Sequence, residues 1–233
     1  MFKKVLVAAA ALMVAACASP YIATPYDRAL ASITQIALVD DSLPTKAIAY
    51  EVASVGSNFG LIGGLIDAGI QLERQNAVND ALAGIAFDAE AELETRLISA
   101  LSAEGYVVAP LESGERAKRD WLETYPAASP QTDAYLDVAV LHYGYMSSGA
   151  SQPFRPAVAA KVKLVRVSDG STLMENQIVY NPLNVMQGVV TIAPNPEYAF
   201  DNRAALLAEP ARMAAGIEDA LNQVADTATQ LLR

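Results

Sequence analysis

A run in the middle of the chain, where apolar residues alternate with other residues, limits the possible folds of this sequence more than any other feature. Between residues 134 and 145 the even-numbered positions are apolar as far as His142, whereas the odd-numbered positions mix tyrosine, aspartate and smaller residues. A period of two residues is typical of a β-strand with one buried face. The same alternation returns at residues 157–167 and 172–180, so the pattern predicts three consecutive strands.

The pairing of the last two strands follows from which residues face each other. A two-residue turn at Asp169-Gly170 would place Glu175 opposite Leu164 and bring a charge into the apolar face. A longer loop, with Gly170 in the left-handed conformation, places Met174 opposite Leu164 instead. Because this register keeps the apolar face intact, we predict a bulged hairpin.

Two stretches show the apolar spacing of three and four residues that marks an amphipathic helix. The first covers residues 79–103, with Asn79 as its N-cap and Gly105 as its stop signal. The second begins at Pro210, a residue favoured in the first turn of a helix, and runs toward the C-terminus. Shorter elements are expected as strands at 33–39, 48–53 and 106–108, and as a short helix plus a loop within 111–131.

These elements predict a mixed α/β (α+β) fold. Each strand has one apolar face and the helices have one apolar stripe, so a sheet with helices packed on it buries both. We expect a mixed sheet with a C-terminal antiparallel hairpin. Residues 33–233 are expected to form a single domain, because this length is enough for one full core and short for two.

The N-terminus carries a targeting signal. Lys3 and Lys4 are followed by an apolar run that is too short to cross a bilayer, and small residues precede Cys17. This order is typical of a secretory signal peptide. The residues Val-Ala-Ala-Cys at 14–17 resemble the lipobox of bacterial lipoproteins, which implies cleavage between Ala16 and Cys17 and acylation of Cys17.

The lipobox resemblance sets the expected organisation and location. Residues 1–16 are predicted to be the signal peptide and residues 17–32 a lipidated tether. The resemblance implies three acyl chains, and more than one chain gives stable anchoring. The residue after the cysteine is Ala18, which by the sorting rule of that family implies the outer membrane, with the domain facing the periplasm.

A second resemblance covers residues 81–232. The order of their elements, with the strand-and-turn segment Val-Lys-Leu-Val-Arg-Val-Ser-Asp-Gly-Ser, is similar to the periplasmic domain of curli-secretion-type lipoproteins and to the TolB N-terminal domain. This resemblance implies a protein of the bacterial envelope. It also leaves open an oligomeric secretion-channel component like the curli lipoprotein.

Small residues recur every four positions within 55–72. If this stretch is helical, Gly56, Gly60, Gly64 and Ala68 lie along one side and permit close approach of another backbone. Glycine costs up to about 1 kcal/mol per residue in a helix interior, so a glycine loop leading into a short helix is the alternative. The stripe would pack on its own domain, on a second copy of the chain or on the membrane surface.

Charge and residue types exclude several kinds of function. The formal charge is −10, and removal of Lys3 and Lys4 with the signal makes it −12, which argues against nucleic acid as a partner. With Cys17 acylated and His142 the only histidine, no Cys/His metal site is expected. Asp40 and Asp41 are interpreted as a turn at a strand end, not as part of a cation site.

The sequence contains no catalytic motif, and His142 is interpreted as a structural residue with a hydrogen-bond partner. We therefore expect a non-catalytic lipoprotein that acts in envelope assembly, as a transport auxiliary or as a structural component. Its expected partners are the membrane, through the lipid, and other envelope proteins; self-association stays open, and no cofactor is expected. The other alternative is a lipid-anchored hydrolase with an unrecognised site.

Overall fold

A mixed β-sheet lies at the centre of the computed structural model, which describes residues 21–52, 68–149, 151–184 and 186–233. Helices pack on the sheet and the C-terminal strands form an antiparallel hairpin, so the predicted fold class is confirmed. The strand order is β3 (Val107–Leu111), β1 (Gln35–Val39), β4 (Ala134–Ser147), β5 (Arg155–Arg166), β6 (Thr172–Tyr180) and β7 (Val190–Ile192), and β2 (Ile48–Glu51) also pairs with β4.

The long strand β4 organises the sheet because three other strands pair with it. Its first residues pair in parallel with β1, its last residues pair in parallel with β2, and β5 runs antiparallel along its other edge. Between these two partners, the edge of β4 makes one backbone bond to the β1–β2 loop, from Val140 N to Ser42 O at 2.8 Å. The edge of β4 therefore changes partner near its middle.

A β-bulge between Val140 and His142 lies at this change of partner. A bulge adds one residue to a strand and so reverses which residues face each side. Val140 and then Tyr143 and Tyr145 enter the main core. His142 therefore lies on the opposite face from the one that the unbroken alternation predicted, and that assignment was wrong.

The hairpin of β5 and β6 has the predicted register. Leu164 pairs with Met174 and Ala160 pairs with Ile178, and the register shifts next to Leu164. Gly170 has a φ of +70°, the left-handed conformation that the longer loop requires. The prediction of a bulged hairpin is confirmed.

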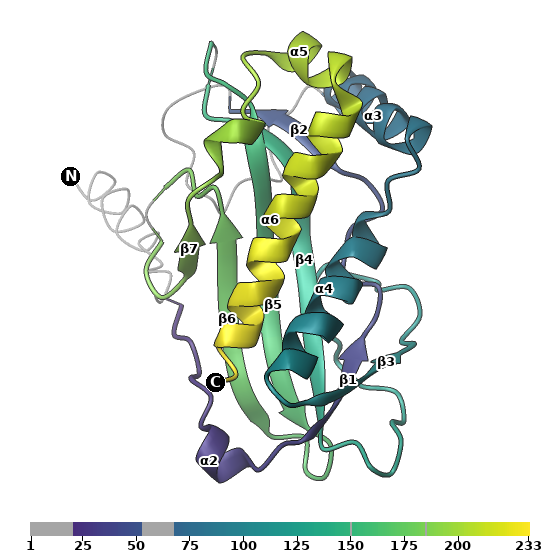
Figure 1. The fold of residues 1–233 in the computed structure, drawn as a ribbon, viewed down its shortest axis with the longest axis vertical. Helices are drawn as coiled ribbons and strands as arrows, with labels where there is room; N and C mark the ends of the chain where they lie inside the picture. Colours follow the sequence, from purple (N-terminus) through teal and green to yellow (C-terminus); the bar gives the residue numbers. More distant parts are fainter. Residues whose placement is uncertain (1–20, 53–67, 150, 185) are drawn as a thin grey trace, which may run out of the picture.

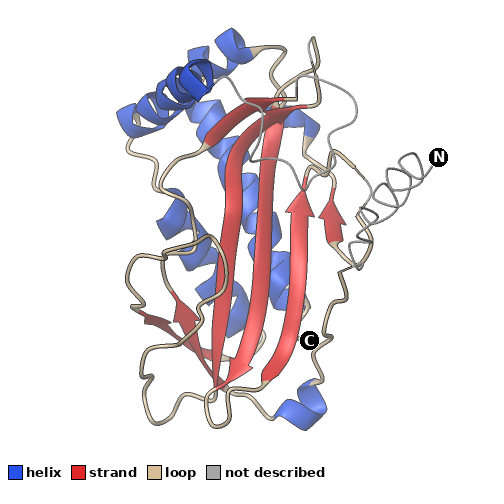
Figure 2. Cartoon of the chain, turned by 180° about the vertical axis from the view of Figure 1, so that it is seen from behind, coloured by secondary structure: helices blue, strands red, loops and turns tan. Residues whose placement is uncertain are grey.

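Two helices cover one face of the sheet: α4 (Ala89–Ala103) and α6 (Pro210–Gln230) (Figure 1). Figure 2, from the opposite side, shows the long strands in front of these helices. Pro210 opens α6 as predicted, and Ile217, Leu221 and Val224 are fully buried along its stripe. The remaining helical elements are α2 (Arg28–Ala31), α3 (Ala68–Gly84), η3 (Pro196–Tyr198) and α5 (Arg203–Ala208).

The helix predicted over residues 79–103 is two helices. Helix α3 ends at Gly84, and Asp88 accepts a hydrogen bond from Ala91 N at 3.1 Å as the N-cap of α4. Asn79 is not an N-cap, because its side chain binds both backbone groups of Ala47, at 2.9 and 3.0 Å. The aspartate cap lets a new helix start, and that start interrupts the apolar spacing.

The face of the sheet opposite the helices is partly covered by the loop of residues 112–133, where no helix forms. Tyr125 of this loop stacks on Tyr135 of β4 with ring centroids 4.7 Å apart. The loop thus helps to close a second, smaller core that contains Ala37, Val39 and Val165. The short helix expected within 111–131 was wrong, because contacts to the sheet hold this segment in an irregular form.

The prediction that residues 17–32 form a tether was wrong for residues 21–32, which contact the domain. Thr24 N donates to Glu175 O at 2.8 Å, and Glu175 N donates to Thr24 O at 3.0 Å, so this segment pairs with β6. Asp27 caps α2, and Ala31 is buried. Residues 21–32 therefore pack on the domain and do not form a free linker.

Several predicted residues lie outside the described ranges. These include Ala16 and Cys17 of the lipobox and Gly56, Gly60 and Gly64 of the small-residue stripe, whereas Ala68 is the first residue of α3. Among the described residues, no helix is both long enough and apolar enough to span a membrane.

Candidate functional site

A cavity of about 550 Å³ opens beside the edge of β4 where that edge changes partner. Its volume lies in the range of small-molecule sites. One wall is the β1–β2 loop, the other is the turn between α3 and α4 with the start of α4, and Tyr143 of β4 also contributes to the lining. The lining residues are Asp41, Leu43, Pro44, Thr45, Ala86, Phe87, Asp88, Ala89, Glu90 and Tyr143.

Glu90 holds the two walls of this cavity together. Its carboxylate accepts hydrogen bonds from Ser42 N at 2.8 Å and from Leu43 N at 2.7 Å. Burial raises the pKa of Glu90, and these two backbone bonds oppose that rise because they favour the charged form. The start of α4 thus fixes one end of the β1–β2 loop, and the bonds of Asn79 to Ala47 fix the other.

Tyr143 brings a hydroxyl group to the cavity. The residue is 7% exposed, and its hydroxyl has no hydrogen-bond partner among the described residues. Burial, with the nearby charges of Glu90 and Asp88, raises the pKa of Tyr143 to about 12, so the hydroxyl stays protonated at neutral pH. It is available to donate to, or accept from, a bound group.

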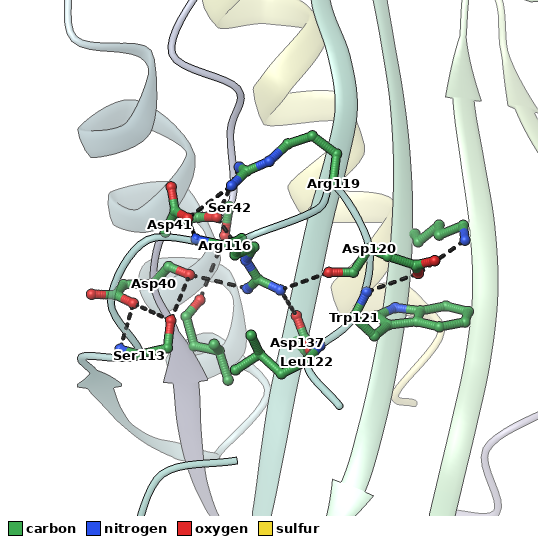
Figure 3. Close-up of polar contacts among 12 residues, drawn as sticks. Asp40, Asp41, Ser42, Ser113, Arg116, Arg119, Asp120, Trp121, Leu122 and Asp137 are labelled. Carbon is green, nitrogen blue, oxygen red and sulfur yellow. Dashed lines mark hydrogen bonds and ion pairs between the residues drawn. The ribbon is translucent and has the colours of Figure 1, made fainter. Parts of the chain in front are cut away.

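A buried ion pair supports the β1–β2 loop from the other face of the sheet (Figure 3). Arg116 donates to Asp137 Oδ1 at 2.8 Å, and the two side chains are 1% and 0% exposed. The guanidinium also donates to the backbone oxygens of Asp40, Asp41 and Asp120, so each of its nitrogens has an acceptor. Such full satisfaction is what a buried charge requires.

The other oxygen of Asp137 fixes the loop of residues 112–133. It accepts from Leu122 N at 2.8 Å and from the Tyr125 hydroxyl at 3.1 Å. Burial is the main cause of a raised pKa for Tyr125, and the charge of Asp137 adds to it. The carboxylate of Asp137 therefore joins β4 to the 112–133 loop.

Arg119 extends this support to the cavity wall. It donates to Leu43 O at 2.6 Å and to Asp41 Oδ2 at 2.8 Å, and both acceptor residues line the cavity. Asp41 has a φ of +51°, a conformation that costs energy for a residue other than glycine. The Arg116 and Arg119 contacts therefore hold the loop in a defined shape, which pre-organises the wall before anything binds.

The lining of the cavity combines acidic groups with apolar surface. Asp41, Asp88 and Glu90 contribute carboxylates, and that of Asp41 is already paired with Arg119, so Asp88 and Glu90 carry the acidic character. Leu43 and Phe87 contribute apolar surface. A positively charged group on an apolar stem, such as a Lys or Arg side chain of another protein, matches this combination.

The ionisable groups of the lining are the carboxylates of Asp41, Asp88 and Glu90 and the hydroxyl of Tyr143. Its carboxylates accept backbone hydrogen bonds: Glu90 from the β1–β2 loop, and Asp88 from the first turn of α4. In the described ranges, no group of three or more His, Cys, Asp or Glu side chains is placed to hold a metal ion.

The residues that the sequence singled out lie elsewhere. His142 is not part of the cavity lining, and burial lowers the pKa of His142 to about 4, so it is neutral at pH 7. The hydrogen-bond partner expected for it is absent among the described residues. Asp40 and Asp41 end β1 as predicted, and they accept bonds from Ser113, Arg116 and Arg119.

Sequence reasoning did not find Glu90, Tyr143 or the Arg116–Asp137 pair. One signal for the pair was present, because Asp137 is a charge in a strand with apolar residues on both sides along the chain. A buried carboxylate of this kind needs a cationic partner. No local pattern identified which arginine that partner would be.

Comparison of the sequence with protein-family models and with curated proteins gives no match. Among solved structures, the chain is similar to protein XCC0632 from Xanthomonas campestris, a crystal structure assigned to the family model DUF330. The similarity has a TM-score of 0.44 and 14% sequence identity, and it covers 90% of each chain. A likeness this distant assigns neither a family nor a function.

Proposed function

We propose that this protein is a lipid-anchored outer-membrane lipoprotein that faces the periplasm and has a non-catalytic role as an envelope assembly, transport-auxiliary or structural component. The lipobox at residues 14–17 carries this proposal, because a charged start, a short apolar run and small residues before Cys17 agree with one another. A second support is the cavity, whose lining suits binding of a partner.

We propose further that an envelope partner inserts a basic side chain into the cavity between the β1–β2 loop and α4. The Tyr143 hydroxyl and the carboxylates around it supply the polar contacts, and Leu43 and Phe87 contact the apolar stem. A charge that leaves water needs such an acidic partner. The pre-organised wall reduces the ordering cost of binding.

Acyl labelling tests the anchor. The wild-type chain, expressed in a bacterial host with labelled palmitate, is expected to incorporate label and to sediment with the outer membrane. The Cys17→Ser variant is expected to incorporate none, because Cys17 is the only cysteine. Equal incorporation by both chains, or none by the wild type, would overturn the lipoprotein proposal.

Site-specific cross-linking in the envelope tests the cavity. A photoreactive residue at Thr45, an exposed lining position, is expected to capture a discrete partner, whereas the same group at exposed Ser171 in the β5–β6 turn is not. Tyr143→Phe, which removes only the hydroxyl, is expected to weaken capture while the protein stays folded. Equal capture from both positions would show that the cavity is not the binding site.

A further inference from the structure

The N-terminal segment is fixed on the domain only a few residues after the proposed acylation site in the sequence. Thr24 is paired with Glu175 in both directions. A side chain added at Gly188 would collide with the carbonyl oxygen of Tyr21, so the backbone of Tyr21 lies directly against the chain that leads into β7. The described chain is therefore already packed on the domain from Tyr21 onward, well before residue 32.

Only four residue steps separate Cys17 from Tyr21. A fully extended chain covers at most about 14 Å in four steps. By contrast, a folded chain of this length has a radius of gyration of roughly 17 Å, and thus a diameter of roughly 45 Å. The tether is shorter than the radius of the domain, so the domain cannot rotate freely above a membrane that holds Cys17.

The segment nearest the anchor also exposes apolar side chains. Ile22 and Leu30 are each 80% exposed, the highest values among the exposed large apolar side chains of the described residues. In Figure 1 this purple segment runs beside β7 and β6 down to α2. Since the lipid itself supplies the affinity, such side chains need only reach the headgroup layer to be covered.

We propose that the edge of the domain formed by residues 21–30 with β6 and β7 faces the membrane surface, and that Ile22 contacts the lipid headgroup layer. The proposal rests on the acylation of Cys17. It also places β3, the strand at the opposite edge of the sheet, away from the membrane.

Fluorescence quenching in vesicles tests this orientation. The acylated protein is reconstituted into phosphatidylethanolamine and phosphatidylglycerol vesicles that contain headgroup spin-labelled lipid. Because acylation consumes the thiol of Cys17, a new cysteine is the only free thiol. The fluorophore is attached in Ile22→Cys or in Val107→Cys, a control on β3 that is also apolar and is 63% exposed. Quenching at position 22 is expected to be several-fold stronger than at position 107.

A flexible Gly/Ser insertion between Ala18 and Ser19 provides the second arm, since it lengthens the tether without changing the domain. Quenching at position 22 is expected to fall toward the value at position 107. Equal quenching at the two positions without the insertion, in protein shown to carry palmitate, would overturn this orientation and leave the lipoprotein proposal intact. A protein without palmitate would overturn both.

Discussion

Loss of one partner of the Arg116–Asp137 pair is expected to destabilise the whole domain. Arg116→Met keeps the apolar part of the side chain but leaves the Asp137 carboxylate, which is 0% exposed, with only Leu122 N and the Tyr125 hydroxyl as donors. Removal of one member of a buried pair costs about 3–5 kcal/mol, whereas typical domains have a free energy of unfolding of about 5–15 kcal/mol. The expected loss is therefore a large part of the total.

The double variant distinguishes an uncompensated charge from a general loss of packing. Arg116→Met combined with Asp137→Leu leaves neither charge buried, so its cost is expected to be clearly less than the sum of the two single costs. Arg96→Met is the matched control, because the Arg96–Asp226 pair is 44% and 33% exposed, and its loss is expected to cost about 1 kcal/mol or less.

Urea denaturation measures these differences. Trp121, the only tryptophan, lies in the covering loop and reports on that region by fluorescence, while circular dichroism reports on the whole domain. Coincident transitions would show that the loop unfolds with the domain. A cost below about 1 kcal/mol for Arg116→Met, or strictly additive costs in the double variant, would refute the reasoning.

Three further outcomes are expected. The pKa of His142 is lowered from 6.5 to about 4, so below pH 6.5 the unfolded chain binds a proton that the folded protein does not. The free energy of unfolding of the wild type is therefore expected to fall by about 1 kcal/mol between about pH 7.5 and 5.5 because of His142, in addition to the effect of other titrating groups. His142→Gln is expected to remove this contribution when chemical denaturation is measured at each pH. Gly216→Ala is expected to lower the free energy of unfolding by about 1–3 kcal/mol, because the new Cβ would lie 2.8 Å from Tyr198 Cβ and overlap the Tyr145 hydroxyl. Gly84 has open space around it, so Gly84→Ala is expected to be neutral or stabilising. Thermal denaturation measures both variants. Asn79→Ala is expected to cost about 1–3 kcal/mol by urea denaturation, since it leaves the buried backbone groups of Ala47 unpaired, and an unchanged midpoint would contradict this.

The sequence predicted those parts of the fold that depend on local periodicity. The register of β5 with β6 followed from which side chains match, and α6 followed from Pro210 and its stripe. The break between α3 and α4 was missed because Leu82 and Leu93 continue a helical spacing across it. The bulge next to Val140 was missed because residues on both sides of it are apolar.

The candidate site could not be predicted in the same way, because its parts are far apart in the chain. Asp41, Glu90 and Tyr143 come from a loop, a helix and a strand, and only the folded sheet brings them together. Arg116 lies in the segment that was expected to form a short helix plus a loop, and no feature of that segment indicated burial of its side chain. Its burial depends on Asp137 and on backbone oxygens of two other segments, and periodicity carries no information about such long-range contacts.

The pairing of Thr24 with Glu175 also has a consequence for how the protein folds. Unpaired strand edges invite association with other chains, and Pro110 in β3 already removes one backbone donor at the far edge of the sheet. On the β6 side, the N-terminal segment occupies part of the edge. If the chain is exported N-terminus first, as the proposed signal peptide requires, residues 21–27 reach the periplasm long before β6. Residues 21–27 therefore stay unpaired until β6 arrives, whereas the edge of β6 meets its covering segment as soon as that strand forms, which shortens the time for which this edge is open to another chain.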